Sequence, residues 1–216
     1  METEILTVNP VQLNLNKIRT AVEYIQDGEI VAFPTDTIYG IGCDVFIPEA
    51  VENIYSIKNR SLDKPINVLV SSQEQIYDIA KNVKSKFFKL VEEFWPGPLT
   101  IVVEKNSDVP DIVTSNLNTV GVRMPNNPIV ISIIDMINTP LATTSANIAE
   151  EESAVTAEKV LEYFNGKIPC VIDGGRTDIG EPSTIVDIAS DPPRIIRQGA
   201  ISSVELRKIL SNIRVK

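Results

Sequence analysis

The sequence predicts an α/β protein in which helices pack on a twisted, mixed, open β-sheet. Segments with helical spacing of apolar residues alternate with short apolar runs rich in β-branched residues along the whole chain. The sequence has no internal repeat and no low-complexity linker. At 216 residues, with 43% hydrophobic and 23% charged residues, the composition fits one globular domain, which we expect to cover residues 1–216.

The first half of the chain begins with an amphipathic helix over residues 15–27, which Gly28 is placed to end. A strand over residues 29–33 follows, and Pro34 opens a polar turn, PTDTIYGIG. The other elements expected up to residue 104 are a helix over 48–58 with Pro48 in its first turn, a strand over 66–70, helices over about 72–81 and 84–94, and a strand over 100–104.

The second half continues the alternation of strands and helices. Thr156 is expected to cap a helix that runs to about Phe164, and Ser202 or Ser203 to cap a closing helix over 202–212. The remaining elements expected are strands over 120–123, 141–144, 169–172, 184–188 and 194–197, a helix over 128–137 and a polar loop over 150–155.

Composition excludes several kinds of chemistry. The chain has no histidine, which removes Ser-His-Asp and Cys-His triads and HExxH zinc sites. Its formal charge of −9 disfavours broad adhesion to nucleic acid or to an anionic membrane surface. Cys43 and Cys170 are far apart, so we expect neither a disulfide framework nor a zinc site, and a reducing cytoplasm is the expected location. The acidic N-terminus and the short apolar runs predict neither a signal peptide nor a membrane span.

Polar and cationic residues gather where the predicted strands end. Each cluster alone also fits a local explanation, such as a turn that satisfies its own backbone or cations that complement a helix dipole. If the clusters converge, however, they bring five cations into one place in an otherwise acidic chain, and such a pocket suits a polyanion such as a nucleoside triphosphate. The five cations are Lys58, Arg60, Lys64, Arg123 and Arg197.

The ordered set of motifs resembles the YrdC-like family of threonylcarbamoyl-AMP synthases over about residues 15–200. The motifs are PTDTIYGIG, KNRSLDKP, WPGPLT, VGVRMP, TTSAN, STIVD and IIRQG. The resemblance implies a twisted mixed sheet with a concave, positively charged cavity. It also implies an enzyme that forms threonylcarbamoyl-AMP and pyrophosphate from L-threonine, bicarbonate and ATP, for N6-threonylcarbamoyladenosine modification of tRNA.

The resemblance also implies roles for individual residues. Lys58 and Arg60 are the expected catalytic residues. The residues expected to contact threonine are Thr37, Arg123, Thr143 and Ser183. The residues expected to contact ATP are Lys58, Arg60, Lys64, Thr119, Ser145, Asn147, Ser153 and Arg197. Magnesium is expected to arrive with ATP, with no protein ligand assigned, although Asp36, Asp44 and Asp173 are candidate contributors.

The chain departs from the family pattern at three places. Leu69 stands where longer members often carry a threonine-contacting histidine. Residues 149–153, Ala-Glu-Glu-Glu-Ser, replace a commoner loop containing Gly and Pro, and this weakens the assignment of Ser153. Because the sequence ends at residue 216, we expect a short form without the extra C-terminal domain of longer members.

The resemblance also implies a mechanism, which the absence of histidine and the five cations of the motifs favour. Threonine's amine captures CO2 or bicarbonate, and the new carboxylate attacks the α-phosphorus of ATP while cations offset the repulsion between two anions. Three alternatives stay open: an RNA-binding module, a related protein with another carbamoyl- or phosphate-handling reaction, and a structural role in which each Arg is paired with a carboxylate. Candidate partners besides the substrates are tRNA and other proteins of the same tRNA-modification pathway.

Overall fold

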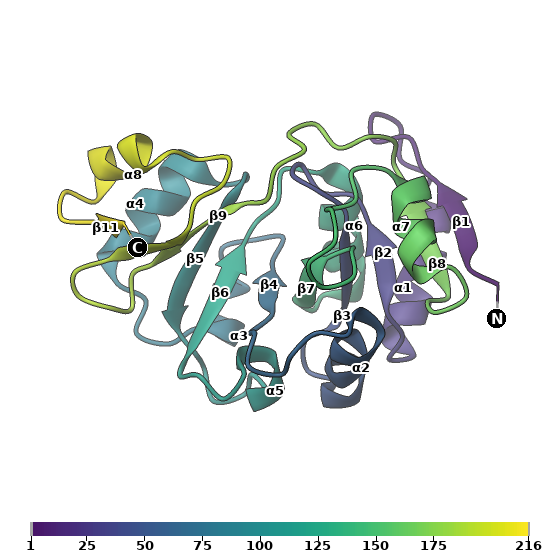
Figure 1. Ribbon diagram of the computed structural model, residues 1–216, viewed down its shortest axis with the longest axis horizontal. Coiled ribbons are helices and arrows are strands. Elements are labelled where there is room, and N and C mark those ends of the chain that lie inside the picture. Colours follow the sequence, from purple (N-terminus) through teal and green to yellow (C-terminus); the bar gives the residue numbers. More distant parts are fainter. Residues whose placement is uncertain (1, 216) are drawn as a thin grey trace.

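The computed structural model describes residues 2–215, whose strands form one mixed sheet with helices on both faces (Figure 1). The strand order is β1-β8-β2-β3-β7-β4-β6-β5-β9-β10-β11. The strands are β1 (Glu4–Thr7), β2 (Val31–Phe33), β3 (Gly40–Asp44), β4 (Asn67–Leu69), β5 (Leu99–Glu104), β6 (Thr119–Arg123), β7 (Leu141–Ser145), β8 (Cys170–Asp173), β9 (Thr184–Asp187), β10 (Arg194–Arg197) and β11 (Arg214–Val215).

Eight helices accompany the sheet within residues 2–215. They are α1 (Leu15–Gln26), α2 (Pro48–Lys58), α3 (Ile76–Ile79), α4 (Ser85–Phe94), α5 (Asp111–Thr114), α6 (Pro128–Ile137), α7 (Ala157–Phe164) and α8 (Ser203–Ile209). None of the helices in this part of the chain combines the length and the hydropathy that a membrane span needs.

Side chains alternate between the two faces of the sheet, as strand geometry dictates. On one face, Val68, Val122 and Ile101 join the larger hydrophobic core. On the other face, α1 and α6 pack against each other and against β2 and β8 in a second core. The residues of β4, β6 and β5 that point to this second face line the cavity described below, and apart from Leu69 and Val102 they are polar, small or cationic. The second face is therefore apolar under the helices and largely polar beside them.

The amphipathic helices lie where the sequence predicts them. The predictions over residues 48–58 and 128–137 are confirmed to the residue, and α1 ends at Gln26 with Gly28 at a φ of 80°. The Thr156 side chain accepts a hydrogen bond from the Lys159 N–H, as expected of a helix cap. Ser202 caps α8 in a capping box with Glu205, although this helix ends at Ile209, three residues before the predicted end at 212. These helices are predictable because their signals are local.

The prediction of a polar turn over PTDTIYGIG is wrong for its last three residues, 40–42. Gly40–Asp44 is strand β3, which pairs with β2 and with β7 in the middle of the sheet. Both glycines are required by close packing. A Cβ on Gly42 would lie 2.7 Å from Oγ1 of Thr143, and a Cβ on Gly40 would lie 2.9 Å from Cγ2 of Thr143. Glycine here permits contact between strands and does not mark a turn.

Four elements differ from the predictions because their signals are weak. The helix expected over 72–81 shrinks to α3, and its neighbours form turns. The strands β1 and β11 and the one-turn helix α5 had no prediction, since segments of two to four residues show no clear periodicity. The sheet therefore includes β1 and β11, which lie outside the residues that carry the family resemblance.

Candidate active site

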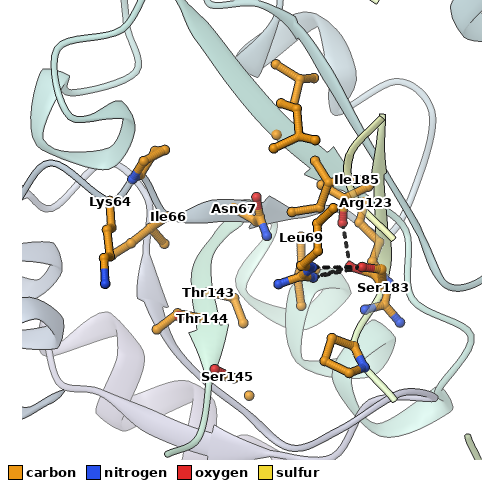
Figure 2. A pocket seen from close by; sticks show the side chains of 18 of the residues that line it. Lys64, Ile66, Asn67, Leu69, Arg123, Thr143, Thr144, Ser145, Ser183 and Ile185 are labelled. Atoms are coloured by element: carbon orange, nitrogen blue, oxygen red, sulfur yellow. Dashed lines mark hydrogen bonds between the residues drawn. The ribbon is translucent and has the colours of Figure 1, made fainter. Parts of the chain in front are cut away.

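A cavity of about 580 Å³ lies on the face of the sheet formed by β7, β4, β6, β5 and β9 (Figure 2). Figure 2 shows Lys64 and Ile66 at one end of this cavity, Asn67 in the middle, and Arg123 and Ser183 at the other end. The residues between β2 and β3, and those between α2 and β4, complete the wall. The cavity therefore gathers segments that are far apart in the sequence.

The floor of the cavity shows why these strands carry small and polar residues. Gly121 leaves room for the Asn67 amide, because a Cβ on Gly121 would lie 2.5 Å from the Asn67 Oδ1. Thr143 lies beside Asn67 on the neighbouring strand, where the two residues are paired in register. The floor thus offers a hydroxyl and an amide to a ligand.

Arg123 is anchored at one end of the cavity. Its guanidinium donates from Nε to the Gly97 carbonyl at 2.9 Å, from Nη1 to the Thr37 hydroxyl at 2.9 Å, and from Nη2 to the Asp36 carboxylate at 2.5 Å. Burial lowers the pKa of Arg123, and the Asp36 carboxylate opposes that shift. An arginine remains charged under such conditions, so Arg123 presents a fixed cation to the cavity.

The loop that carries Thr37 is organised by its own hydroxyls. The Thr35 hydroxyl donates to the Ile38 carbonyl at 2.7 Å and accepts the Thr37 N–H at 3.1 Å. The Thr37 hydroxyl lies 2.9 Å from the Thr35 hydroxyl. Thr35 therefore satisfies the local backbone, whereas Thr37 is held between Thr35 and Arg123 at the cavity wall.

Two further arginines line the cavity and are held by oxygen atoms that carry no full charge. Arg60 donates to the carbonyls of Lys64 and Pro65 at 3.0 and 2.8 Å. Arg197 donates to the Ser183 carbonyl at 2.8 Å and to its hydroxyl at 3.1 Å. Neither guanidinium forms an ion pair with a carboxylate among residues 2–215, so the purely structural alternative does not hold for them.

Arg197 experiences the charge of the other two cavity arginines. Desolvation lowers the pKa of Arg197, and the positive charges of Arg123 and Arg60 lower it further. Desolvation also lowers the pKa of Arg60. Asp63 is the one carboxylate among the described residues that line the cavity. Four cations thus share the cavity with a single acidic lining residue, an arrangement that favours a ligand with several negative charges.

Lys58 lies behind the wall and does not line the cavity. It is 2% exposed, and its ammonium donates to the carbonyl of Ser145 at 2.5 Å and to that of Asn147. Burial, together with the nearby Arg60 cation, lowers the pKa of Lys58 to about 7. The expectation that all five cations converge in one pocket therefore holds for four of them. Lys58 instead ties α2 to the segment that follows β7.

Residues 23–199 match the family model Sua5/YciO/YrdC, which carries the description "Telomere recombination". The chain belongs to the Sua5/YciO/YrdC family. It is 41% identical over 199 residues to threonylcarbamoyl-AMP synthase from Pyrococcus abyssi and 34% identical over 200 residues to that from Bacillus subtilis. Each alignment covers 92% of this chain and 58% of the relative, so the chain spans a little over half the length of these two proteins.

Solved structures of the Sua5/YciO/YrdC family have the same fold. The structure of Pyrococcus abyssi Sua5 complexed with L-threonine superimposes with a TM-score of 0.97 at 40% identity, covering 99% of this chain and 63% of that one. Escherichia coli YciO superimposes with a TM-score of 0.86 at 23% identity, and it supports the fold alone. The predicted fold class is thereby confirmed.

Most of the positions singled out by family resemblance meet in the cavity. The lining includes Thr37, Arg60, Lys64, Thr119, Arg123, Thr143, Ser145, Ser183 and Arg197. Lys58, Asn147 and Ser153 do not line it. Asn147 is buried, and its amide donates to the Glu151 carbonyl at 2.6 Å. The individual roles stay predictions, since convergence alone does not assign a ligand to a side chain.

The structure adds residues that the motifs did not single out. Asn67 lines the cavity from β4, two residues before Leu69 on the same face. Asp36 belongs to the PTDT motif but was considered only as a metal contributor. Its ion pair with Arg123 joins residues 87 positions apart, so no local sequence signal could reveal it.

Proposed function

We propose that this chain condenses L-threonine, bicarbonate and ATP into threonylcarbamoyl-AMP and pyrophosphate, as a nucleotidyltransferase that supplies tRNA modification. The observation that carries the proposal is the convergence of four cations and the hydroxyls of Thr37, Thr143 and Ser183 on one cavity. Family membership supports the same reading. The Vibrio campbellii threonylcarbamoyl-AMP synthase is 27% identical and aligns over 100% of its own length, so a protein of this size carries that name.

The geometry suits a reaction between two anions. Threonine's amine attacks CO2 and loses a proton, or attacks bicarbonate, whose C–OH bond breaks so that water leaves, and either route gives an N-carboxylate. An oxygen of this carboxylate attacks the α-phosphorus of ATP, the bond to the bridging oxygen of the β-phosphate breaks, and pyrophosphate leaves with that electron pair. In the proposed reaction, Arg123 holds the amino-acid carboxylate, while Arg60, Lys64 and Arg197 stabilise charge on the phosphates; that all four line one cavity supports these roles.

Magnesium enters this proposal as a companion of ATP. Among the described residues, no three acidic or cysteine side chains gather closely enough to hold a metal ion. Asp44 and Asp173 do not line the cavity, and Asp36 is engaged by Arg123. Asp63 alone offers a carboxylate from the lining, and one carboxylate together with phosphate oxygens and water is a donor set that Mg²⁺ accepts.

The test is an omission experiment. The chain is incubated with ATP, L-threonine and bicarbonate, each left out in turn, and pyrophosphate and the adenylate are measured. We expect both products only when all three substrates are present. Pyrophosphate release without threonine, or no release at all, would contradict the proposal.

Two variants and a control locate the activity in the cavity. Arg60→Ala and Arg123→Ala should each lower threonine-dependent pyrophosphate release by about a hundred-fold or more, because each removes a preorganised cation. Arg207→Ala removes an exposed cation from α8, outside the cavity, and should retain the activity of the unaltered chain. Full activity in both cavity variants would rule out the proposed mechanism.

A further inference from the structure

One carboxylate lies directly behind the cavity wall. Asp36 is 4% exposed, and its Oδ1 accepts hydrogen bonds from Nη2 of Arg123 and, at 3.1 Å, from the Asn126 N–H. Its Oδ2 is buried without a hydrogen-bond partner among residues 2–215. A carboxylate that is half-satisfied and removed from water is costly unless a nearby cation stabilises it. Arg123 is that cation.

Asp36 also fixes the orientation of the guanidinium that faces the ligand. An arginine has five N–H donors in one plane. In Arg123, three of them are engaged by Gly97, Thr37 and Asp36, one from each nitrogen. Three contacts in different directions determine the plane, and the two remaining N–H groups are free for a ligand. A shift of Asp36 would remove the hydrogen bond that holds Nη2 of Arg123.

The ion pair sets the charge at this end of the cavity. Two guanidiniums lie there, Arg123 and Arg197, and the positive charge of Arg123 lowers the pKa of Arg197. Asp36 matches the charge of Arg123, while Arg197 has no carboxylate partner in the described part of the chain. The end therefore carries about one unmatched positive charge in place of two. A lower positive charge repels the ammonium group of a ligand less. It therefore favours a carboxylate that carries an ammonium group over one that does not.

We propose that Asp36 is a positioning residue that makes this site select a zwitterionic amino acid over the corresponding carboxylic acid without an amine. It does so by fixing the Arg123 guanidinium and by matching its charge. The inference rests on the proposed function, because it concerns the amino-acid substrate of the same cavity. It adds a determinant of substrate choice that lies outside the lining.

The test compares two ligands that differ in the amine. L-Threonine and (R)-3-hydroxybutanoate, which is threonine without its amino group, are titrated calorimetrically into the full chain. We expect the second ligand to bind on the order of ten-fold more weakly than the first. Asp36→Asn keeps an acceptor for Arg123 and Asn126 but removes the charge. The ratio of the dissociation constant of (R)-3-hydroxybutanoate to that of L-threonine should therefore fall by about ten-fold in this variant.

A matched control separates this effect from a general loss of a buried carboxylate. Asp187 is also 4% exposed and pairs with an arginine, Arg194, and it accepts the Ala189 N–H at 2.9 Å. It does not line the cavity. Asp187→Asn should leave the ratio of the two dissociation constants unchanged. If Asp36→Asn leaves the ratio unchanged as well, the inference is wrong.

A second variant tests positioning and carries the test if Asp36→Asn does not fold. Asp36→Glu keeps the charge but lengthens the side chain, so both ligands should bind more weakly while their ratio is kept. Unchanged affinities in Asp36→Glu, or equal affinities of the two ligands for the unaltered chain, would each overturn the inference. These outcomes are distinct from a failure of the proposed function, which would appear as no adenylate formed by the unaltered chain.

Discussion

The Lys58 side chain lies inside the protein against two backbone carbonyls, those of Ser145 and Asn147. We predict that Lys58→Met destabilises the fold by about 2–4 kcal/mol, because two buried acceptors would lose their donor. Thermal unfolding followed by circular dichroism measures the change. An unaltered melting temperature would show that water or a shift of the chain replaces the ammonium group.

Lys58 also predicts how stability varies with pH. Its folded-state pKa of about 7 lies below the ordinary value of 10.5, so between these values the unfolded chain binds more protons than the folded one. The free energy of unfolding therefore rises with pH across this window, by up to about 1.4 kcal/mol per pH unit, and the cost of burying the charge is fully present at and below pH 7.

The measurement is a difference between the unaltered chain and Lys58→Met from pH 7 to 9. Taking the difference cancels the contributions of other groups to the pH dependence of stability. One such group is Cys170, whose pKa burial raises to about 12. The stability of the unaltered chain relative to the variant should increase with pH. A difference that stays flat would mean that Lys58 keeps an ordinary pKa.

Sequence reasoning found most of the cavity's residues through motifs, but it could not give their geometry. Arg123 is one of the five cations that the motifs predict in the pocket, but its ion pair with Asp36 appears only in the structure. Lys58 was grouped with the ligand-binding cations, since sequence does not show on which side of the wall an ammonium lies. The sequence does not predict a role for Asn67, because a single amide in a strand of three residues forms no motif.

At the scale of elements, strand β3 depends on two residues without side chains. We predict that Gly42→Ala destabilises the fold by about 2–4 kcal/mol, because the added Cβ would lie 2.9 Å from the Ala142 carbonyl and 2.7 Å from the Thr143 hydroxyl. Gly180→Ala is the control, since at a φ of 76° it has nothing within 4 Å of the new Cβ.

Chemical denaturation of the two glycine variants checks this prediction. The control should lose only about 1–2 kcal/mol, the usual cost of a left-handed conformation in a residue other than glycine. Equal losses in the two variants would show that close packing between β3 and β7 is not what requires glycine at position 42.

The amphipathic helices could be predicted and several strands could not, for a physical reason. Helices such as α1 and α6 carry their caps and apolar stripes within about a dozen residues. Strands of two to five residues are defined by partners elsewhere in the chain. β1 pairs with β8, more than 160 positions away, and β3 is a strand because β2 and β7 flank it.

At the scale of the whole molecule, the charge is divided between surface and cavity. The chain carries −9 overall, yet four cations line one cavity with a single carboxylate. We therefore predict that the chain alone does not bind unmodified tRNA tightly at about 0.15 M salt, because phosphate backbones need a broad basic surface. Fluorescence anisotropy with labelled tRNA across a salt series checks this.

The alternative of an RNA-binding module makes the opposite prediction. Saturable tRNA binding well below about 10⁻⁶ M, with a steep decrease as salt rises and no turnover of nucleotide, would favour it. Weak binding that ATP and threonine leave unchanged would agree with the enzymatic proposal.

The segment 174–183 runs across the molecule from β8 near one end of the sheet to β9 near the other (Figure 1). On the way, its N–H groups at Ile179 and Gly180 donate to the carbonyls of Asp36 and Thr37. The side of the cavity formed by Ser183 and Arg197 is thus added after this crossing. During synthesis on the ribosome, the cavity is therefore complete only after residue 197 has emerged, so a ligand that needs both sides of it cannot assist the folding of the strands that come before.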